Sequence, residues 1–201
     1  MGRYTGPRVK ISRREGTDIF DNPRWNKRNF PPGQHGQKKT RGNSDYGKQL
    51  REKQKAKLMY GLFERQFANL FQKAQSAEGE VGINLLKALE QRLDNVLYRG
   101  GLAKTRRLAR QLVSHGHIRV NDKKTDIPSY RVKTGEVISI KASKLKQPYW
   151  LTLSEKVKKV ETPSWIKTDL TAMNITVTGE PIKNDLPQNI ETNLIIEFYS
   201  R

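Results

Sequence analysis

The chain has 201 residues and a formal net charge of +19, with 39 Lys and Arg against 20 Asp and Glu, 34% apolar residues and no cysteine. A positive excess on this scale indicates a polyanionic partner, either a nucleic acid or an anionic membrane surface. No segment approaches the roughly 18 consecutive apolar residues of a membrane-spanning helix, so we do not expect a membrane partner. The lack of cysteine excludes disulfides and cysteine-ligated zinc.

The charge is unevenly distributed along the chain. The net charge is +11 over residues 1–60, zero over 61–103, +11 over 104–160 and −3 over 161–201. A protein that binds polyanions through charge alone does not need this segregation. The two basic blocks therefore suggest two binding surfaces on one scaffold.

Residues 1–44 read as an irregular basic arm. Pro31-Pro32-Gly33 excludes a helix or a central strand at that point. Aromatic residues such as Tyr4 and Trp25 are scattered among the basic ones. A solvated, disordered tail is one interpretation, but this composition favours an arm that becomes ordered on a nucleic acid.

From about residue 45 the pattern becomes helical. Ser44 or Asp45 is a plausible N-cap, and the first half of the segment, 48–57, is mostly charged. The second half carries apolar residues at helical spacing, which predicts a core-facing stripe made of Phe63, Phe67, Leu70 and Phe71. The segment "AEGEVG" at 77–82 is expected to end this helix.

A second helix is predicted over "NLLKALEQRLDNVLYR", residues 84–99. Its leucines fall on one arc, which indicates a buried face, and Arg92 and Arg99 lie beside that arc. Gly100-Gly101 is expected to end the helix. Asp94 could bond Arg92 or Arg99, or act as a helix cap.

A third helix is predicted from Thr105, as its cap, to about His115, with Gly116 at its end. One side is apolar, and the adjoining sector holds Arg106, Arg107 and Arg110. Arginines on one helical face suit nucleic-acid backbone, because the planar guanidinium can bond phosphate oxygens in pairs. We therefore interpret this helix as the edge of a phosphate-binding surface.

The segments "HIRVN", "SYRV" and "VISI" are predicted as short strands joined by turns at "NDKKT" and "KTGE". The lysine-rich segment that follows is expected to pack Tyr149, Trp150 and Trp165 back on the helices. The terminal "NLIIEFYSR" reads as a strand or a docking segment. The pattern predicts an α+β fold.

The sequence offers little for catalysis or metal binding. His115 and His117 form an HxH pair, but no cysteine or acidic cluster accompanies them. There is no phosphate-binding glycine loop and no G-x-S-x-G motif. We therefore expect no enzyme activity, no metal, no cofactor and no small-molecule substrate, and we interpret both histidines as polar residues at a helix end.

Several long motifs carry a resemblance to a known family. "LEQRLDNVLYRGGLAKTRRLARQLVSHGHIRVNDKKTDIPSYRVKTGEVISI" resembles the S4 RNA-binding domain. "MGRYTGPRVKISRREGTDIF", "PPGQHG", "SDYGKQLREKQKAKLMYGLFERQF" and "NLIIEFYSR" extend the resemblance from Met1 to Arg201, to the bacterial-type ribosomal protein uS4 family. It implies a helical body over 45–90, with 155–201 packing back on it, an inserted S4 domain of two short helices and a small antiparallel sheet over 91–154, and an extended basic arm over 1–44.

The resemblance also implies partners and site residues. Family members bind the 5′ domain of small-subunit (16S-type) rRNA at a multi-helix junction, early in subunit assembly. They lie near the mRNA entry tunnel beside ribosomal proteins uS5 and uS3, and the uS5 contact bears on decoding accuracy. The implied rRNA-binding residues of the S4 domain are Arg92, Arg99, Lys104, Arg106, Arg107, Arg110, Ser114, His115 and His117. Those before it are Arg3, Tyr4, Arg13, Arg14, Arg51 and Lys55, and transient mRNA contact is implied for Lys38, Lys39 and Arg41.

The chain departs from the family in one respect. Many bacterial members carry a zinc-binding cysteine cluster before "PPGQHG", and this chain has no cysteine. We therefore expect rRNA contacts and local packing, with Trp25 and Phe30 as candidates, to hold the arm. We expect a cytoplasmic 30S-type ribosome, although the sequence leaves an organellar one open. The alternatives are a general nucleic-acid chaperone and an S4-domain RNA-modifying factor.

Overall fold

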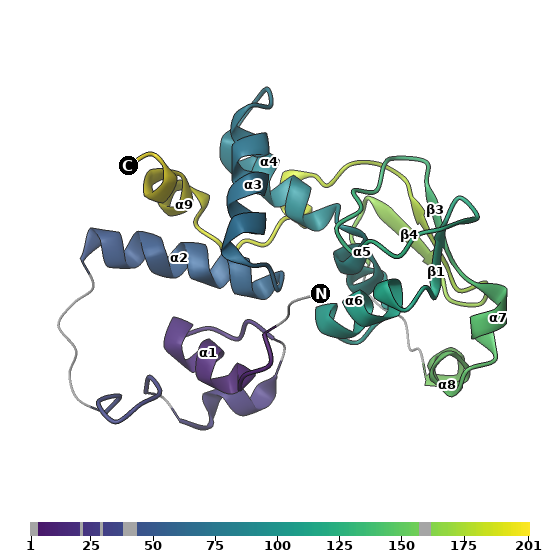
Figure 1. Ribbon diagram of the computed structural model, residues 1–201, viewed down its shortest axis with the longest axis horizontal. Coiled ribbons are helices and arrows are strands. Elements are labelled where there is room, and N and C mark those ends of the chain that lie inside the picture. The colour runs from purple at the N-terminus through teal and green to yellow at the C-terminus, as the bar shows by residue number, and fades with distance from the viewer. Residues whose placement is uncertain (1–3, 21, 29, 38–43, 157–161) are drawn as a thin grey trace. The chain divides into compact units, whose positions relative to one another are not determined.

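The computed structural model describes residues 4–20, 22–28, 30–37, 44–156 and 162–201 (Figure 1). The chain forms two compact units: unit 1 comprises Met1–Gly82 and Gln188–Arg201, and unit 2 comprises Ile83–Pro187. Helices and a small antiparallel sheet together confirm the predicted α+β class. Within the described ranges, no helix is both long and apolar enough to span a membrane.

The N-terminal part of unit 1 contains more regular structure than the sequence indicated. It forms α1 (Arg8–Glu15) and the short 3-10 helix η1 (Pro23–Lys27). The Arg13 side chain donates from Nε and Nη2 to the Phe30 carbonyl oxygen, at 3.0 and 2.8 Å, and its guanidinium lies 4.9 Å from the Phe30 ring centroid. These contacts join α1 to a segment 17 residues further along the chain.

The rest of unit 1 is built from α2 (Asp45–Met59), α3 (Glu64–Gln75) and α9 (Thr192–Tyr199). Ser44 caps α2 as predicted, because its side chain accepts a hydrogen bond from the backbone N–H of Gly47 at 3.2 Å. The expected continuous helix is broken at Gly61, whose φ of 62° is a left-handed conformation that glycine adopts at little cost. The terminal segment, expected as a strand or docking segment, is a helix that packs along α2 (Figure 1).

The aromatic stripe of α3 was largely predicted. Phe67 and Phe71 are buried, and the Phe71 ring lies 4.5 Å, between centroids, from the Tyr199 ring of α9. Phe63 is 47% exposed, so its expected place in the core was wrong. Phe63 precedes the helix as its N-cap residue, in an extended conformation that removes it from the helical face.

Unit 2 contains α4 (Val81–Glu90, which begins at the end of unit 1), α5 (Leu93–Arg99) and α6 (Arg106–Ser114). The predicted helix over 84–99 is therefore two helices. Arg92 adopts an extended conformation and forms an isolated antiparallel bridge with Arg131. The break is fixed by non-local backbone hydrogen bonds from Val132 to Gln91 and from Leu93 to Tyr130.

The five-stranded sheet of unit 2 has the order β2-β1-β3-β5-β4, and every pair is antiparallel. The strands are β1 (Ile118–Val120), β2 (Lys123–Lys124), β3 (Val137–Ile140), β4 (Ile166–Asp169) and β5 (Asn174–Val177). "SYRV" contributes only the bridge at Arg131 instead of a strand. Residues 155–201 were expected on the helical body, yet 166–177 form a hairpin that pairs with β3.

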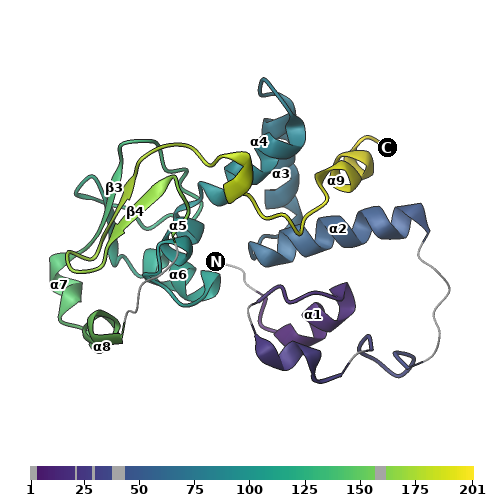
Figure 2. The ribbon, with the colours of Figure 1, turned by 180° about the vertical axis from the view of Figure 1, so that it is seen from behind.

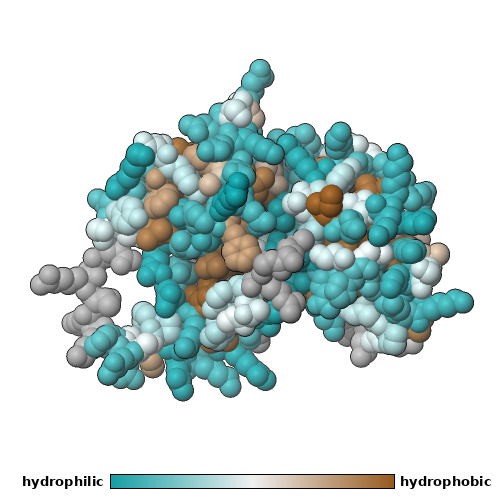
Figure 3. Space-filling model, viewed as in Figure 1, coloured by the Kyte–Doolittle hydropathy of each residue, from teal (hydrophilic) through white to brown (hydrophobic). Residues whose placement is uncertain are grey.

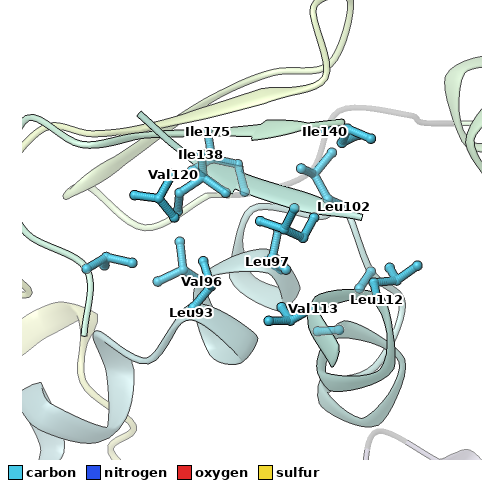
Figure 4. Packing of buried hydrophobic residues seen from close by; sticks show 14 of the residues in the cluster. Leu93, Val96, Leu97, Leu102, Leu112, Val113, Val120, Ile138, Ile140 and Ile175 are labelled. Atoms are coloured by element: carbon cyan, nitrogen blue, oxygen red, sulfur yellow. The ribbon is translucent and has the colours of Figure 1, made fainter. Parts of the chain in front are cut away.

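Helices α5 and α6 lie together on one side of this sheet in both ribbon views (Figures 1 and 2). Apolar side chains from the two helices meet those of the strands (Figure 4). The buried cluster includes Leu93, Val96, Leu97, Leu112, Val113, Ile118, Val120, Ile138, Ile140 and Ile175. This packing holds the two helices at a fixed position on the sheet.

Gly100, at the end of α5, permits the close approach of α5 to β5, because a Cβ atom there would lie 2.3 Å from Cδ1 of Ile175. The remaining elements of unit 2 are α7 (Ala142–Leu145), α8 (Pro148–Lys156) and the 3-10 helix η2 (Lys183–Asp185). Trp150 of α8 and Trp165 are buried in the core cluster, whereas Tyr149 is partly buried against it.

Candidate nucleic-acid interface

The outward side of α6 carries an exposed polar ridge. Thr105 caps the helix as predicted, accepting a hydrogen bond from the backbone N–H of Leu108 at 3.2 Å. Arg107, Gln111 and Ser114 follow at helical spacing and are exposed. Including the flanking residues, the exposed ridge comprises Lys104, Arg107, Gln111, Ser114 and His115. Hydrophilic side chains likewise cover most of the face seen in Figure 3.

Behind this ridge, a buried carboxylate holds two of the predicted arginines. Asp94 of α5, 3% exposed, accepts from Nε and Nη2 of Arg92 at 3.1 and 2.9 Å. The same carboxylate accepts from Nε and Nη2 of Arg110, on α6, at 2.9 and 2.6 Å. Of the partners proposed for Asp94, Arg92 is confirmed and Arg99 was wrong.

A second buried carboxylate organises Arg99 and Arg106. Glu90, at the end of α4 and 0% exposed, accepts from Nη2 and Nε of Arg99 at 2.9 and 3.0 Å. Asn95 donates to Oε2 of Glu90 at 2.8 Å, and its own Oδ1 accepts from Nε of Arg106 at 2.8 Å. The guanidinium of Arg106 lies 4.4 Å from the ring centroid of Tyr98.

These contacts fix the direction of side chains that are flexible on most surfaces. Arg99, Arg106 and Arg110 are partly exposed, whereas Arg92 is 6% exposed and serves mainly to support Asp94. Asp94 binds two arginines, and Glu90 binds Arg99 and, through Asn95, holds Arg106, so four guanidinium groups outnumber two carboxylates. A cationic face with preset donors is suited to a ligand that presents phosphates in a defined geometry.

The structure places the two histidines in different environments. His115 is the exposed C-cap residue of α6, as expected for a polar helix end. His117 is buried instead, and its Nδ1 accepts a hydrogen bond from Nε1 of Trp150 at 3.1 Å. Burial, followed by the nearby charges of Lys144 and His115, lowers the pKa of His117 below its ordinary value of 6.5. The expectation that His117 lies at the surface was therefore wrong, because the indole of α8 covers it.

The candidates of unit 1 are placed differently. Tyr4 and Arg14 are exposed, whereas Arg13 is occupied by its bonds to the Phe30 carbonyl. Arg51 donates to Glu15 at 3.1 Å, and Lys55 donates to Glu52 at 3.0 Å. The candidates Arg3, Lys38, Lys39 and Arg41 lie outside the described residues.

Sequence reasoning missed the supporting residues Glu90, Asn95 and Tyr98. The sequence contained a signal for Glu90, because Glu90 and Asp94 are the acidic residues of an otherwise leucine- and arginine-rich stretch. An acid placed between apolar helical positions is expected to need a buried cationic partner. Among the residues that the structure describes, no group of three or more His, Cys, Asp or Glu side chains could hold a metal ion.

The helix pair on its small sheet, with an arginine-rich outer side, defines an RNA-binding protein of the S4-domain class. The family model described as "S4 domain" matches residues 91–138, and the one described as "Ribosomal protein S4/S9 N-terminal domain" matches residues 3–90. The chain belongs to the family of small ribosomal subunit protein uS4.

Bacterial proteins with that name are similar to this chain over its full length. The protein from Roseiflexus sp. (strain RS-1) is 48% identical over 206 aligned positions, and that from Brevibacillus brevis 47% over 203. The protein from Parabacteroides distasonis is 46% identical over 202 positions. In each case the alignment covers 100% of both chains.

Proposed function

We propose that this protein is a non-enzymatic, structural constituent of a bacterial-type small ribosomal subunit in the cytoplasm, and that it binds small-subunit rRNA through unit 2. The names of its full-length relatives support the assignment to the subunit. The observation that carries the RNA-binding surface is the cationic face of α5 and α6, whose arginines are oriented by Asp94 and Glu90.

The rRNA target we propose is the 5′ domain, at a junction of several helices. Side chains cannot read the deep, narrow major groove of A-form RNA, so recognition there depends mainly on shape, phosphates and 2′-hydroxyls. Arginines held in fixed directions suit this type of recognition. We further propose that residues 1–44 act as an arm beside a body over 45–90, and that Tyr4 and Arg14 of the arm add contacts to the same RNA.

The remaining parts of the proposal concern neighbours. We assign uS5 and uS3 as protein partners, early binding as a role in subunit assembly, and the uS5 contact as a contribution to decoding accuracy. Lys38, Lys39 and Arg41 are proposed to contact mRNA transiently at the entry tunnel. The family resemblance supports these assignments, and the basic segment that follows "PPGQHG" agrees with the last one.

A filter-binding competition tests the central claim. Labelled rRNA 5′ domain would compete against tRNA, duplex DNA and large-subunit rRNA at about 0.2 M salt, where non-specific electrostatic binding is weakened. A preference of roughly several hundred-fold for the 5′ domain is expected, within the specific-to-non-specific ratios of dedicated binders. Equal binding to every competitor would instead indicate a general nucleic-acid chaperone.

A paired substitution locates the surface. Lys104→Ala combined with Arg107→Ala should reduce the slope of log affinity against log salt by up to roughly 0.7–0.9 per lost phosphate contact. Lys133→Ala combined with Lys167→Ala removes the same charge from exposed positions outside α5 and α6 and should change the slope less. Equal changes in the two variants would argue against α6 as the contact surface.

A further inference from the structure

We infer that two acidic residues, Asp94 and Glu90, promote RNA binding as positioning residues, and that removing the negative charge of either weakens specific RNA binding. The inference rests on the proposed function, because it concerns the same cationic face. It differs from that function in assigning a positive role to carboxylates beside a polyanion.

Simple electrostatics predicts the reverse. A carboxylate near RNA phosphates repels them, so replacing it by an amide should tighten binding. Asp94 and Glu90, however, are 3% and 0% exposed and lie behind the arginines that they bind. Guanidinium groups neutralise the charge of both acids at close range. We therefore expect their repulsion of RNA phosphates to be small, and their orientation of the arginines to be the larger effect.

The bonding pattern at Asp94 shows how the acid orients Arg110. Oδ2 of the carboxylate accepts from both Nε and Nη2 of Arg110, at 2.9 and 2.6 Å, which holds this edge of the guanidinium against Asp94. Arg92 bonds the same carboxylate through two nitrogens at 3.1 and 2.9 Å and holds it in place from the side of α5. Without the acid, Arg110 loses these two bonds and its side chain gains freedom, so ordering it on the RNA costs more.

Glu90 does the same for two further arginines. It binds Arg99 through two nitrogens and holds the amide of Asn95, whose oxygen accepts from Arg106. The acid therefore directs Arg99 directly and Arg106 through Asn95. Stacking of Arg106 on Tyr98 fixes the face of that guanidinium.

Fixed directions matter for specificity more than for total attraction. A flexible cation binds any polyanion, whereas a pre-oriented set of donors favours the phosphate spacing that it matches. Loss of the acids should therefore lower affinity for the rRNA 5′ domain while leaving affinity for duplex DNA unchanged or slightly higher. The ratio of the two affinities is the quantity that a purely electrostatic role would not lower.

The test compares Asp94→Asn and Glu90→Gln with Asp122→Asn in the full-length protein. Asp122 is exposed, has a φ of 60° that asparagine tolerates, and provides a matched loss of one negative charge. We expect a fall of about tenfold in 5′-domain affinity for the two buried sites, the scale of one charge-assisted hydrogen bond. The control should bind as the wild type does or slightly more tightly. Buried-site variants that behave like the control would overturn the inference.

A double-mutant cycle separates positioning from general damage. If Asp94 acts through Arg110, then Asp94→Asn should have little further effect in an Arg110→Ala background, and additive losses would contradict the inference. Each affinity is corrected for the fraction of folded protein, measured by circular dichroism, and for the fraction of binding-competent protein, measured by stoichiometric titration. Glu90→Gln removes the charge of a second acid that holds a different arginine, Arg99, so it provides the test if Asp94→Asn does not fold.

A third measurement needs no substitution. In the wild-type protein, the Nε–H resonances of Arg99 and Arg110 should be resolved from those of flexible arginines and protected from exchange before RNA is added. Merging of these signals with the flexible set would overturn the inference. Failure of the proposed function is recognised separately, because the wild type would then show no preference for the 5′ domain.

Discussion

The two units each place an acid at the centre of a basic cluster, but the two acids differ in their surroundings. Asp94 in unit 2 is buried and binds Arg92 and Arg110. Glu64 in unit 1 has a side chain that is 48% exposed and binds Lys53 and Lys57 at 2.6 and 2.8 Å. Tyr199 of the last helix also donates to Glu64, at 3.0 Å.

The comparison shows that one acidic cluster joins helices and the other orients arginines. Glu64 joins α2, α3 and α9, so its cluster holds helices together, and its lysines are compact charges without a fixed fork. Asp94 joins arginines whose planar groups it can orient. Burial of the carboxylate strengthens the Asp94 cluster and makes its loss costly, whereas in the Glu64 cluster the carboxylate is half exposed to water although Lys53 is buried.

Removing the acids should give the largest contrast. Asp94→Ala leaves two arginines without their buried partner and should lower the free energy of unfolding by about 3–5 kcal/mol. Glu64→Ala should cost less, about 1–2 kcal/mol, because the carboxylate is half exposed although its partner Lys53 is buried. Urea unfolding of both variants measures this, and equal losses would break the comparison.

A substitution in the packing between α5 and the sheet, which supports the arginine cluster, should have the next largest effect on stability. In Gly100→Ala, the new methyl would collide with Ile175, and overpacking of this kind costs roughly 1–3 kcal/mol. Gly179→Ala is the matched control, because nothing lies within 4 Å of its added Cβ. Thermal melting compares the two, and a stable Gly100→Ala variant would show that α5 can move away from the sheet.

Loss of the hydrogen bond from Tyr199 of the last helix to Glu64 should have a smaller effect on the free energy of unfolding. Tyr199→Phe removes one hydrogen bond and should cost about 0.5–1.5 kcal/mol. Burial opposes ionisation of Glu64, but the bonds from Lys53, Lys57 and Tyr199 outweigh it and lower the pKa of Glu64 to about 2. Carboxyl NMR titration should detect this value and a rise in the variant. Because the folded pKa is depressed, the stability from this cluster is present above pH 4.5 and is lost as pH falls towards 2.

The smallest expected effect concerns His117. Its pKa lies below 6.5 because it is buried and near Lys144 and His115, so protonation opposes folding. The stability that the neutral ring contributes is therefore present above pH 6.5 and declines as pH falls through the folded pKa. NMR titration should find Nδ1 unprotonated at pH 7, and His117→Asn should reduce the loss of thermal stability between pH 7 and pH 5. A ring that titrates above 6.5 would contradict the burial by Trp150.

The local parts of the fold were predictable from the sequence. The Thr105 cap, the third helix, β1 and β3 follow from capping chemistry and alternation that a short window contains. The break at Gln91–Arg92 was not predictable, because it is made by hydrogen bonds to residues about 40 positions away. The terminal helix was missed because its short apolar run fits a strand equally well until it packs on α2.

The site was predicted as a set of arginines but not as a structure. Helical spacing placed Arg106, Arg107 and Arg110 on neighbouring sectors of one helix. It could not say that Arg110 binds Asp94 or that Arg106 binds Asn95, because both partners lie on α5. His117 was assigned to the surface for the same reason, since the residue that covers it, Trp150, lies 33 positions further along the chain.

Unit 1 is built from both ends of the chain, with Gln188–Arg201 completing what Met1–Gly82 begins. During synthesis the chain emerges from its N-terminus, so α2 and α3 leave the ribosome long before the helix that packs on them. Unit 2 is continuous in sequence and can close its core first. We therefore expect unit 2 to complete its core before unit 1, although the first helices of unit 1 emerge earlier.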